Sequence, residues 1–439
     1  MGLPIVAIIG RPNVGKSTLF NRFSKSNNAV VDNTPGVTRD RNYSVVNWGS
    51  RSLVVVDTGG LVIAPRGEME LSVTKQAEIA ASEADVVIFV VEKTITPEDK
   101  EIANRLRIEK FPVLLAVNKI DSEKEIQMAA DAWSLAIGEP HSISAKNGRG
   151  VADLLDRIME VLPESGKGEE SHGEIRIAVI GKPNVGKSSF VNKLLGEEKL
   201  IVDSRPGTTR DPIDTHFTYN GKKWVFTDTA GLLRKQQYGI EYYSSLRTVS
   251  AVKRSDVVFL LTDAEVGFKQ QDKRIAGMSI DFIKGIVIGI NKWDLIEAET
   301  NTAAEKRKEI LAEANFLRFS PLITLSALTG QRVRKVLQLL ETVAEERKKR
   351  IPTSEFNNFI ERIKIKNPPP IVQGKRSNIL YATQEGINPP VFVLFCRGIK
   401  FISQNYKRFI INSIRSEYGF EGVSIKVVFR EHKRERELV

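Results

Sequence analysis

The sequence predicts an α/β fold: two tandem domains, each with a mostly parallel sheet and helices on both faces, followed by a smaller α+β domain. Blocks of sequence recur about 171 residues apart, and within each copy short apolar runs alternate with longer amphipathic stretches. The pattern changes after residue 350, which predicts the last domain. We expect domains at 1–162, 174–350 and 351–439, with a polar, glycine-containing linker at 163–173.

The composition narrows the class of protein. Hydrophobic residues make up 41% and charged residues 27%, which is typical of folded domains. A single cysteine, Cys396, excludes a disulfide framework and a cysteine-based zinc site, and its apolar neighbours predict a buried thiol. No apolar run reaches the roughly 18 residues of a membrane span. Against 54 Asp and Glu, 65 Lys and Arg give a net charge of +11, which favours a polyanionic partner.

Five motifs are repeated in the same order. The first three pairs are offset by 171 residues and the last two by 173 and 182, so the second copy has gained residues mainly between its last two motifs. The pairs are 6–17 with 177–188, 34–40 with 205–211, 57–60 with 228–231, 118–121 with 291–294, and 144–146 with 326–328.

Continuous β-branched runs predict the central strands of each copy, because strands buried on both faces lack the alternation of half-exposed ones. These runs are 53–56, 86–91 and 113–117 in the first copy and 225–226, 257–261 and 286–290 in the second. The second copy is expected to close with a helix whose apolar face carries Val333, Val336, Leu337, Leu340 and Val343. The basic run 347–350 suits the end of that helix, and Pro352 stops it.

The last domain has the predicted order α-β-β-α-β. Phe356, Phe359, Ile360 and Ile363 define one face of its first helix. Strands are expected at 378–383 and 391–395, then a helix that ends near Gly419, and a final strand at 424–429.

The first repeated motif, Gly-x4-Gly-Lys-Ser between a strand and a helix, is typical of a phosphate-binding loop. Glycine lets the backbone N–H groups point at phosphates, and the helix N-terminus adds its dipole. We expect Lys16 and Lys187 to contact the β- and γ-phosphates and to act in catalysis, and Ser17 and Ser188 to ligate Mg²⁺. The remaining expected nucleotide-binding residues of the two loops are Gly10, Arg11, Pro12, Asn13, Val14, Gly15, Gly181, Lys182, Pro183, Asn184, Val185 and Gly186.

The Asn-Lys-x-Asp motif indicates that the base is guanine. The carboxylate of Asp121 or Asp294 can accept hydrogen bonds from the N1–H and the exocyclic amine of guanine. Adenine offers no such pair of donors and would leave a desolvated charge unpaired, a loss of about 3 kcal/mol. The other residues expected at the base are Asn118, Lys119, Ile120, Ser144 and Ala145 in the first copy and Asn291, Lys292, Trp293, Ser326 and Ala327 in the second.

The remaining motifs are expected to sense the γ-phosphate. Asp57 and Asp228 should hold Mg²⁺, while Thr38 and Thr209 should close a switch loop onto the metal and act in catalysis. The motif that follows each aspartate is also assigned to the nucleotide: Thr58, Gly59, Gly60 and Leu61, and Thr229, Ala230, Gly231 and Leu232. Signalling GTPases carry a water-orienting glutamine where Leu61 and Leu232 stand. Leucine cannot orient water, so we expect slow intrinsic hydrolysis or help from another group.

With these motifs the whole chain resembles the Der (EngA-type) double-Era-like GTPases, members of the TrmE-Era-EngA-EngB-Septin-like superfamily. The resemblance implies two P-loop GTPase domains, a KH-like third domain, and GTP or GDP with Mg²⁺ as ligands. It also implies a monomeric bacterial cytoplasmic or plastid protein that binds the rRNA of the large ribosomal subunit and acts in its late assembly. Asn13 and Asn184 match the loop position that binds K⁺ in relatives. The alternative is that these asparagines only brace the switch.

Three questions stay open on the sequence alone. The third domain carries 15 Lys and Arg against 8 Glu, which suits RNA, but docking against a GTPase domain is a competing use of its surface. We expect it to lack the Gly-x-x-Gly loop of RNA-binding KH domains, because Gly398 has no partner at that spacing. The alternative to ribosome assembly is a regulatory GTPase that switches a protein or membrane partner. One of the two GTPase domains could also serve as a non-hydrolysing regulatory site.

Overall fold

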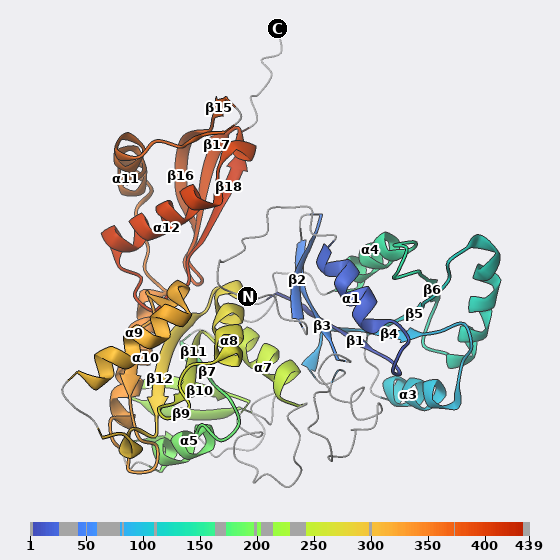
Figure 1. Cartoon of the computed structure of the whole chain (residues 1–439), viewed down its shortest axis with the longest axis horizontal. Coiled ribbons are helices and arrows are strands. Elements are labelled where there is room, and N and C mark those ends of the chain that lie inside the picture. The colour runs from blue at the N-terminus through green and yellow to red at the C-terminus, as the bar shows by residue number, and fades with distance from the viewer. Residues whose placement is uncertain are drawn as a thin grey trace. The chain divides into compact units, whose positions relative to one another are not determined.

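The computed structural model describes most of the chain, which Figure 1 shows coloured from N- to C-terminus. The described residues are 3–25, 43–49, 51–58, 80, 83–108, 112–162, 173–196, 200–202, 214–228, 243–297, 301–372 and 374–432. Contacts group the chain into two compact units. One contains the first sheet together with residues 243–254, and the other contains the second sheet and the C-terminal sheet. None of the helices within the described ranges is both long and apolar enough to cross a membrane.

The first sheet has six strands in the order β2-β3-β1-β4-β5-β6, and only β2 is antiparallel to its neighbour. The strands are β1 (Ile5–Ile9), β2 (Tyr43–Trp48), β3 (Arg51–Asp57), β4 (Val86–Val91), β5 (Val113–Val117) and β6 (Pro140–Ser142). The helices are α1 (Lys16–Lys25), α3 (Pro97–Ile108) and α4 (Val151–Val161), with a 3₁₀ segment at Glu123–Leu135. Apolar side chains of α1 and α4 share one buried cluster with one face of the sheet, which places both helices on that face.

The second sheet repeats this plan in the order β13-β12-β11-β7-β10-β9-β8. Its strands are β7 (Glu174–Ile180), β8 (Ile201–Val202), β9 (Thr215–Tyr219), β10 (Lys222–Thr227), β11 (Val257–Asp263), β12 (Gly285–Asn291) and β13 (Leu322–Thr324). The helices of this part of the sequence are α5 (Lys187–Leu195), α7 (Tyr243–Arg254), α8 (Gln270–Asp281), α9 (Thr302–Glu313) and α10 (Val333–Glu346), and short 3₁₀ turns lie at Trp293–Leu295 and Asn315–Leu317. The α/β fold class and the parallel core of both sheets are confirmed.

The C-terminal domain follows the predicted order and adds a short hairpin. Its elements are α11 (Thr353–Lys366), β14 (Ile371–Val372), β15 (Lys375–Arg376), β16 (Asn378–Gly386), β17 (Val391–Arg397), a 3₁₀ turn at Ile399–Phe401, α12 (Gln404–Tyr418) and β18 (Lys426–Glu431). The three long strands form one sheet in which β17 lies in the middle. Cys396 is fully buried there, and burial raises the pKa of its thiol to about 12, so the prediction of an inert buried cysteine is confirmed.

One hydrophobic core continues from the second GTPase-like sheet into the C-terminal sheet. The predicted apolar face of α10 is buried in this core together with Phe356 of α11 and Phe392 of β17. Backbone hydrogen bonds add to the junction: the N–H of Ile286 donates to Gly422 at 2.7 Å, and that of Gly422 donates to Phe319 at 2.7 Å. Docking against a GTPase domain is therefore one use of the third domain's surface.

One sequence-based expectation about this junction is wrong. The third domain does contain the Gly-x-x-Gly spacing, at Gly419 and Gly422, but this turn is part of the docking surface. A Cβ on Gly422 would lie 2.5 Å from Val343, so the turn is packed against α10. The basic run does lie at the end of α10, as expected, and its first residue, Arg347, is only 3% exposed.

The side chain of Arg347 connects three segments of the second unit by hydrogen bonds. Its guanidinium donates to the backbone oxygen of Ile283 at 2.7 Å and to Oδ1 of Asn388 at 2.9 Å, which joins α10 to the segment before β12 and to the turn before β17. Burial lowers its pKa to about 10, so the side chain is still charged at neutral pH. Replacing Arg347 would remove both of these hydrogen bonds.

We expect Arg347→Met to lower the free energy of unfolding of the second unit by about 2 kcal/mol, since it removes two hydrogen bonds from a charged donor, each worth about 1.5 kcal/mol, and the removal of a buried charge offsets part of that loss. Urea unfolding measures this when Trp48 and Trp133 are replaced by Phe, because the remaining tryptophans then report on the second unit. The control is Arg350→Met at an exposed position, which should change stability by no more than about 0.5 kcal/mol. Equal effects of the two variants would contradict the bridging role.

Candidate functional site

Two phosphate-binding loops follow β1 and β7 and lead into α1 and α5. In both loops the asparagine has a left-handed backbone, with φ of 66° at Asn13 and 62° at Asn184, a conformation that asparagine tolerates better than most residues. A Cβ on Gly10 would lie 2.2 Å from the backbone oxygen of Val90, and one on Gly181 would lie 2.2 Å from that of Leu261. The first glycine of each loop is therefore required by the close approach of the neighbouring strand.

The lysine of each loop is held inside the loop by the loop's own carbonyls. Lys16 Nζ donates to the backbone oxygens of Gly10 and Arg11, both at 2.7 Å. Lys187 Nζ does the same with Gly181 at 2.9 Å and Lys182 at 2.6 Å. Burial lowers the pKa of both lysines, and that of Lys187 falls to about 8. Ser17 and Ser188 are the second residues of α1 and α5, directly after these lysines.

An asparagine in each copy joins three of the predicted motifs. Asn118 Nδ2 donates to the backbone oxygen of Val14 at 2.8 Å, and its Oδ1 accepts from the N–H of Ala145 at 2.9 Å. Asn291 makes the matching bonds with Val185 at 2.7 Å and Ala327 at 2.9 Å. The structure therefore places the phosphate loop, the Asn-Lys-x-Asp loop and the Ser-Ala loop together in both copies.

The two aspartates assigned to guanine lie beside these clamps and are exposed. In the first copy, Asp121 Oδ1 accepts from the Ser144 hydroxyl at 2.6 Å and from Asn147 Nδ2 at 3.1 Å, which orients the carboxylate. The motif lysines are paired with acids: Lys119 contacts Glu92, and Lys292 Nζ lies 2.6 Å from Asp263 Oδ2. Ile120 and Trp293, at the variable position, are buried.

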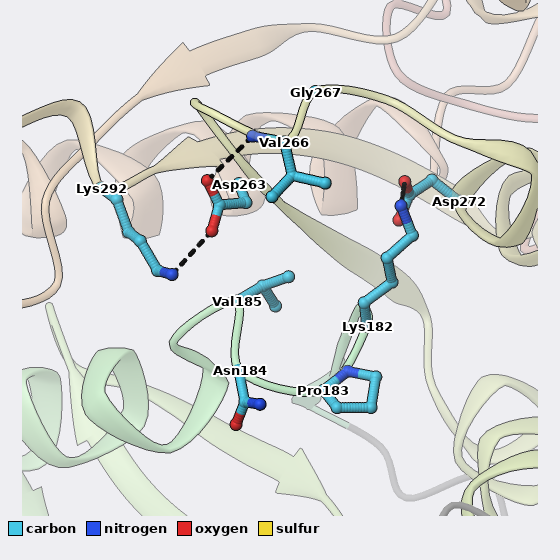
Figure 2. Close-up of a pocket in the computed structure, with 9 residues that line it drawn as sticks. All are labelled: Lys182, Pro183, Asn184, Val185, Asp263, Val266, Gly267, Asp272 and Lys292. Carbon is cyan, nitrogen blue, oxygen red and sulfur yellow. Dashed lines mark hydrogen bonds and ion pairs between the residues drawn. The ribbon is translucent and has the colours of Figure 1, made fainter. Parts of the chain in front are cut away.

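A cavity of about 180 Å³ lies beside the second phosphate loop (Figure 2). Burial opposes ionisation of Asp263 in its wall, but hydrogen bonds from Lys292 and from the amides of Glu265 and Val266 outweigh burial and lower its pKa. The cavity therefore contains fixed charges of both signs. Its lining residues are Lys182, Pro183, Asn184, Val185, Asp263, Val266, Gly267, Asp272 and Lys292.

The two aspartates that the sequence assigns to Mg²⁺ are held differently. Asp57 is fully buried and ends β3 in register with Ile8, and Thr58 donates its hydroxyl to Ile8 at 2.6 Å. Asp228 follows β10 with a left-handed φ of 59°, and its N–H donates to Asp214 Oδ1 at 3.0 Å. The two sites thus differ in geometry although their motifs match. The other predicted switch residues lie outside the described residues: Thr38, Gly59, Gly60, Leu61, Thr209, Thr229, Ala230, Gly231 and Leu232.

A buried carboxylate anchors the second residue of each phosphate loop, and the motif analysis missed it. Asp99 Oδ1 accepts from Arg11 Nε at 2.7 Å, and Asp272 Oδ2 lies 2.7 Å from Lys182 Nζ (Figure 2). Both aspartates sit in the first turn of a helix and are at most 1% exposed. They are 173 residues apart, the same offset as the Asn-Lys-x-Asp motif, and that offset is the signal that could have found them.

Comparisons with known proteins agree over the whole chain. The family model described as "50S ribosome-binding GTPase" matches residues 5–119 and 176–292, and the model "KH-domain-like of EngA bacterial GTPase enzymes, C-terminal" matches 350–430. GTPase Der of Desulfitobacterium hafniense (strain DSM 10664 / DCB-2) is 45% identical over all of both chains. GTPase Der of Caldanaerobacter subterraneus subsp. tengcongensis is 46% identical over 97% of this chain and 98% of its own. The structure of Aquifex aeolicus Era bound to GDP·AlF₄⁻ is 20% identical, with a TM-score of 0.30, over 59% of this chain and 93% of that one.

Asp99→Asn should weaken GDP binding at the first site about tenfold, because the carboxylate fixes Arg11, whose backbone oxygen in turn holds Lys16. The measurement is a titration with fluorescent GDP in an Asp294→Asn background. That change places an amide N–H where guanine needs an acceptor and so disables the second site.

Arg11→Lys is the matched variant and should keep the affinity within about twofold, since the second copy places Lys182 at this position. Asp153→Asn, at an exposed position of α4, is the control for charge alone. If Asp99→Asn lowers thermal stability and leaves GDP affinity unchanged, the aspartate serves the fold and not the loop.

GDP affinity at the second site should fall about fivefold between pH 8 and pH 9. Lys187 is charged below its pKa of about 8 and neutral above it, so the free site loses the charge that attracts phosphate as the pH rises. Titrations in an Asp121→Asn background isolate this site. Lys187→Arg stays charged and should remove the decline, whereas an equal decline in that variant would assign it to the nucleotide.

Proposed function

The chain belongs to the GTPase Der family, and from this premise we propose that it is an assembly factor of the large ribosomal subunit that binds rRNA under the control of GTP. GTP hydrolysis to GDP and phosphate is the activity of the family. In the proposed role this hydrolysis serves as a timer: the GTP-bound protein binds the immature subunit, and hydrolysis releases it.

Both sites contain the groups that such chemistry needs. Lys16 and Lys187 would contact the phosphates from inside their loops. The hydroxyls of Ser17 and Ser188 and the carboxylates of Asp57 and Asp228 are hard oxygen donors of the kind that Mg²⁺ prefers, and both donor types occur in each copy. Bound Mg²⁺ would neutralise charge between the phosphates. Thr38 and Thr209 would close the switch loop of each copy onto this metal.

The water-orienting glutamine is replaced by Leu61 and Leu232, so another positive charge near the phosphates would compensate. We propose that Asn13 and Asn184 help to hold K⁺ there. Their left-handed backbones present exposed side chains at the loop, which supports the assignment. Equal turnover in Na⁺ and K⁺ would contradict it and favour a bracing role for these asparagines.

The observation that carries the proposal is that the second nucleotide site and the basic third domain share β12. At its C-terminal end, Asn291 clamps the phosphate loop to the guanine loop. At its N-terminal end, Gly285 forms an antiparallel bridge with Val423, and Ile286 donates to Gly422. One strand thus contacts the nucleotide site at one end and a basic domain at the other. This arrangement suits an RNA-binding protein that is controlled by GTP.

Co-sedimentation with purified large ribosomal subunits tests the proposal. We expect pelleting in a non-hydrolysable GTP analogue, little pelleting in GDP, and a loss of binding as salt rises, because phosphate contacts release counterions. Lys16→Ala and Lys187→Ala, tested separately, show which site controls binding. Pelleting that ignores the nucleotide would reduce the basic surface to non-specific RNA binding. Pelleting with lipid vesicles or with a protein partner instead would favour the regulatory GTPase.

A further inference from the structure

We propose that the outer face of the β16-β17-β18 sheet binds single-stranded RNA by stacking bases on Tyr381 and Phe395. This inference rests on the proposed rRNA partner and assigns the surface that contacts it. The Gly-x-x-Gly turn at Gly419 and Gly422, the place to look for an RNA clamp in a KH-like domain, is packed against the second GTPase domain. RNA bound by this domain therefore needs another face.

The strand register divides the side chains of this sheet between two faces. Ile379, Ala382, Phe392, Leu394 and Val427 point into the core that α11 and α12 also line. Figure 1 shows those two helices on the same side of the sheet. Because side chains alternate along a strand, the opposite face carries Tyr381, Thr383 and Glu385 of β16, Val393, Phe395 and Arg397 of β17, and Lys426, Val428 and Arg430 of β18, with His432 just beyond.

Aromatic rings occupy the middle of this outer face. Tyr381 and Phe395 are opposite each other in the register, and their rings stack with centroids 4.4 Å apart and planes 14° apart. The ring of His432 lies edge-on at 6.1 Å from that of Tyr381. Tyr381 is 42% exposed, so part of its ring is open to a ligand. Aromatic side chains on the face of a sheet are the device by which RRM domains stack RNA bases.

The charges around the rings suit a phosphate backbone. Among the described residues of this face, Arg397, Lys426 and Arg430 stand against one acid, Glu385. Arg430 holds both oxygens of Glu385, at 2.6 and 2.9 Å, and the pair passes from β18 to β16 over the fully buried Val393 of β17. Both side chains are nearly half exposed, so the pair contributes little to stability. A phosphate can replace Glu385 in the same bidentate geometry.

If phosphate replaces Glu385 on Arg430, substitutions on this face should change RNA affinity in opposite directions, which a surface that is only basic would not produce. Glu385 competes with phosphate for Arg430, so removing its charge should strengthen RNA binding, while removing the Tyr381 ring should weaken it. The matched acid is Glu361 on α11, which is exposed and pairs with Lys364 at 2.7 Å on the helical side of the domain. Glu361→Gln changes the net charge by the same amount as Glu385→Gln, at a different face.

The experiment is fluorescence anisotropy of the full-length protein with fluorescein-labelled A₁₂ RNA at fixed salt. We expect Tyr381→Ala to weaken binding about tenfold and Tyr381→Phe to keep it within about twofold, because stacking needs the ring and not the hydroxyl. Glu385→Gln should strengthen binding about threefold, and Glu361→Gln should change it by less than about 1.5-fold. Thermal unfolding of each variant checks that the domain remains folded.

The outcomes separate this inference from the proposed function. If the wild type binds RNA and ribosomal subunits while Tyr381→Ala and Glu385→Gln bind A₁₂ unchanged, the sheet face is not the RNA surface and the ribosomal role stands. If Tyr381→Ala loses ribosomal subunits but binds A₁₂ as the wild type does, the face contacts a ribosomal protein, and the inference is overturned. A wild type that binds neither RNA nor subunits would overturn the proposed function itself.

Discussion

Each nucleotide site depends on one asparagine side chain that joins three distant segments. A carboxamide carries a donor and an acceptor on one rigid group, so Asn118 can bind the backbone oxygen of Val14 and the backbone N–H of Ala145 at once. An aspartate could make only the second bond. The clamp also explains the second glycine of each loop, because a Cβ on Gly15 would lie 2.2 Å from Nδ2 of Asn118 and one on Gly186 would lie 2.3 Å from that of Asn291. The phosphate loop is thus shaped by a residue more than 100 positions away.

The two copies keep this clamp and the loop anchor but differ where the metal would bind. Asp57 ends a strand in a fully buried position, whereas Asp228 leaves its strand in a left-handed conformation and is hydrogen-bonded to Asp214. Burial lowers the pKa of both loop lysines, that of Lys187 to about 8. Identical motifs therefore lie in different surroundings. This difference is a physical reason to expect that the two sites recognise base and phosphate in the same way but differ in the steps that depend on the metal.

The sequence predicted the parts of the structure that local patterns encode. The central strands of both copies, the apolar face of α10 and the burial of Cys396 follow from periodicity and neighbouring residues. The Asp99 and Asp272 anchors could not be found in the same way, because each pairs with a loop residue far away in sequence and resembles an ordinary acid at a helix start. The burial of Arg347 could not be predicted for a related reason. A run of four basic residues is typical of a solvated helix end, and the acceptors that Arg347 binds, at Ile283 and Asn388, lie far away in sequence.

The shared strand β12 limits how a nucleotide at the second site can act on RNA. The third domain is fixed to the start of β12 by an antiparallel bridge at Gly285, by the buried Arg347 and by a core continuous with the sheet. Moving it relative to the Asn-Lys-x-Asp loop would break these backbone bonds and expose apolar surface, so the third domain and the second sheet are expected to move as one body. In the proposed role, exchange of GTP for GDP would then act on the second unit as a whole and change where the proposed RNA-binding face is presented. A gate of this kind controls access to RNA and leaves the intrinsic affinity of the face unaltered.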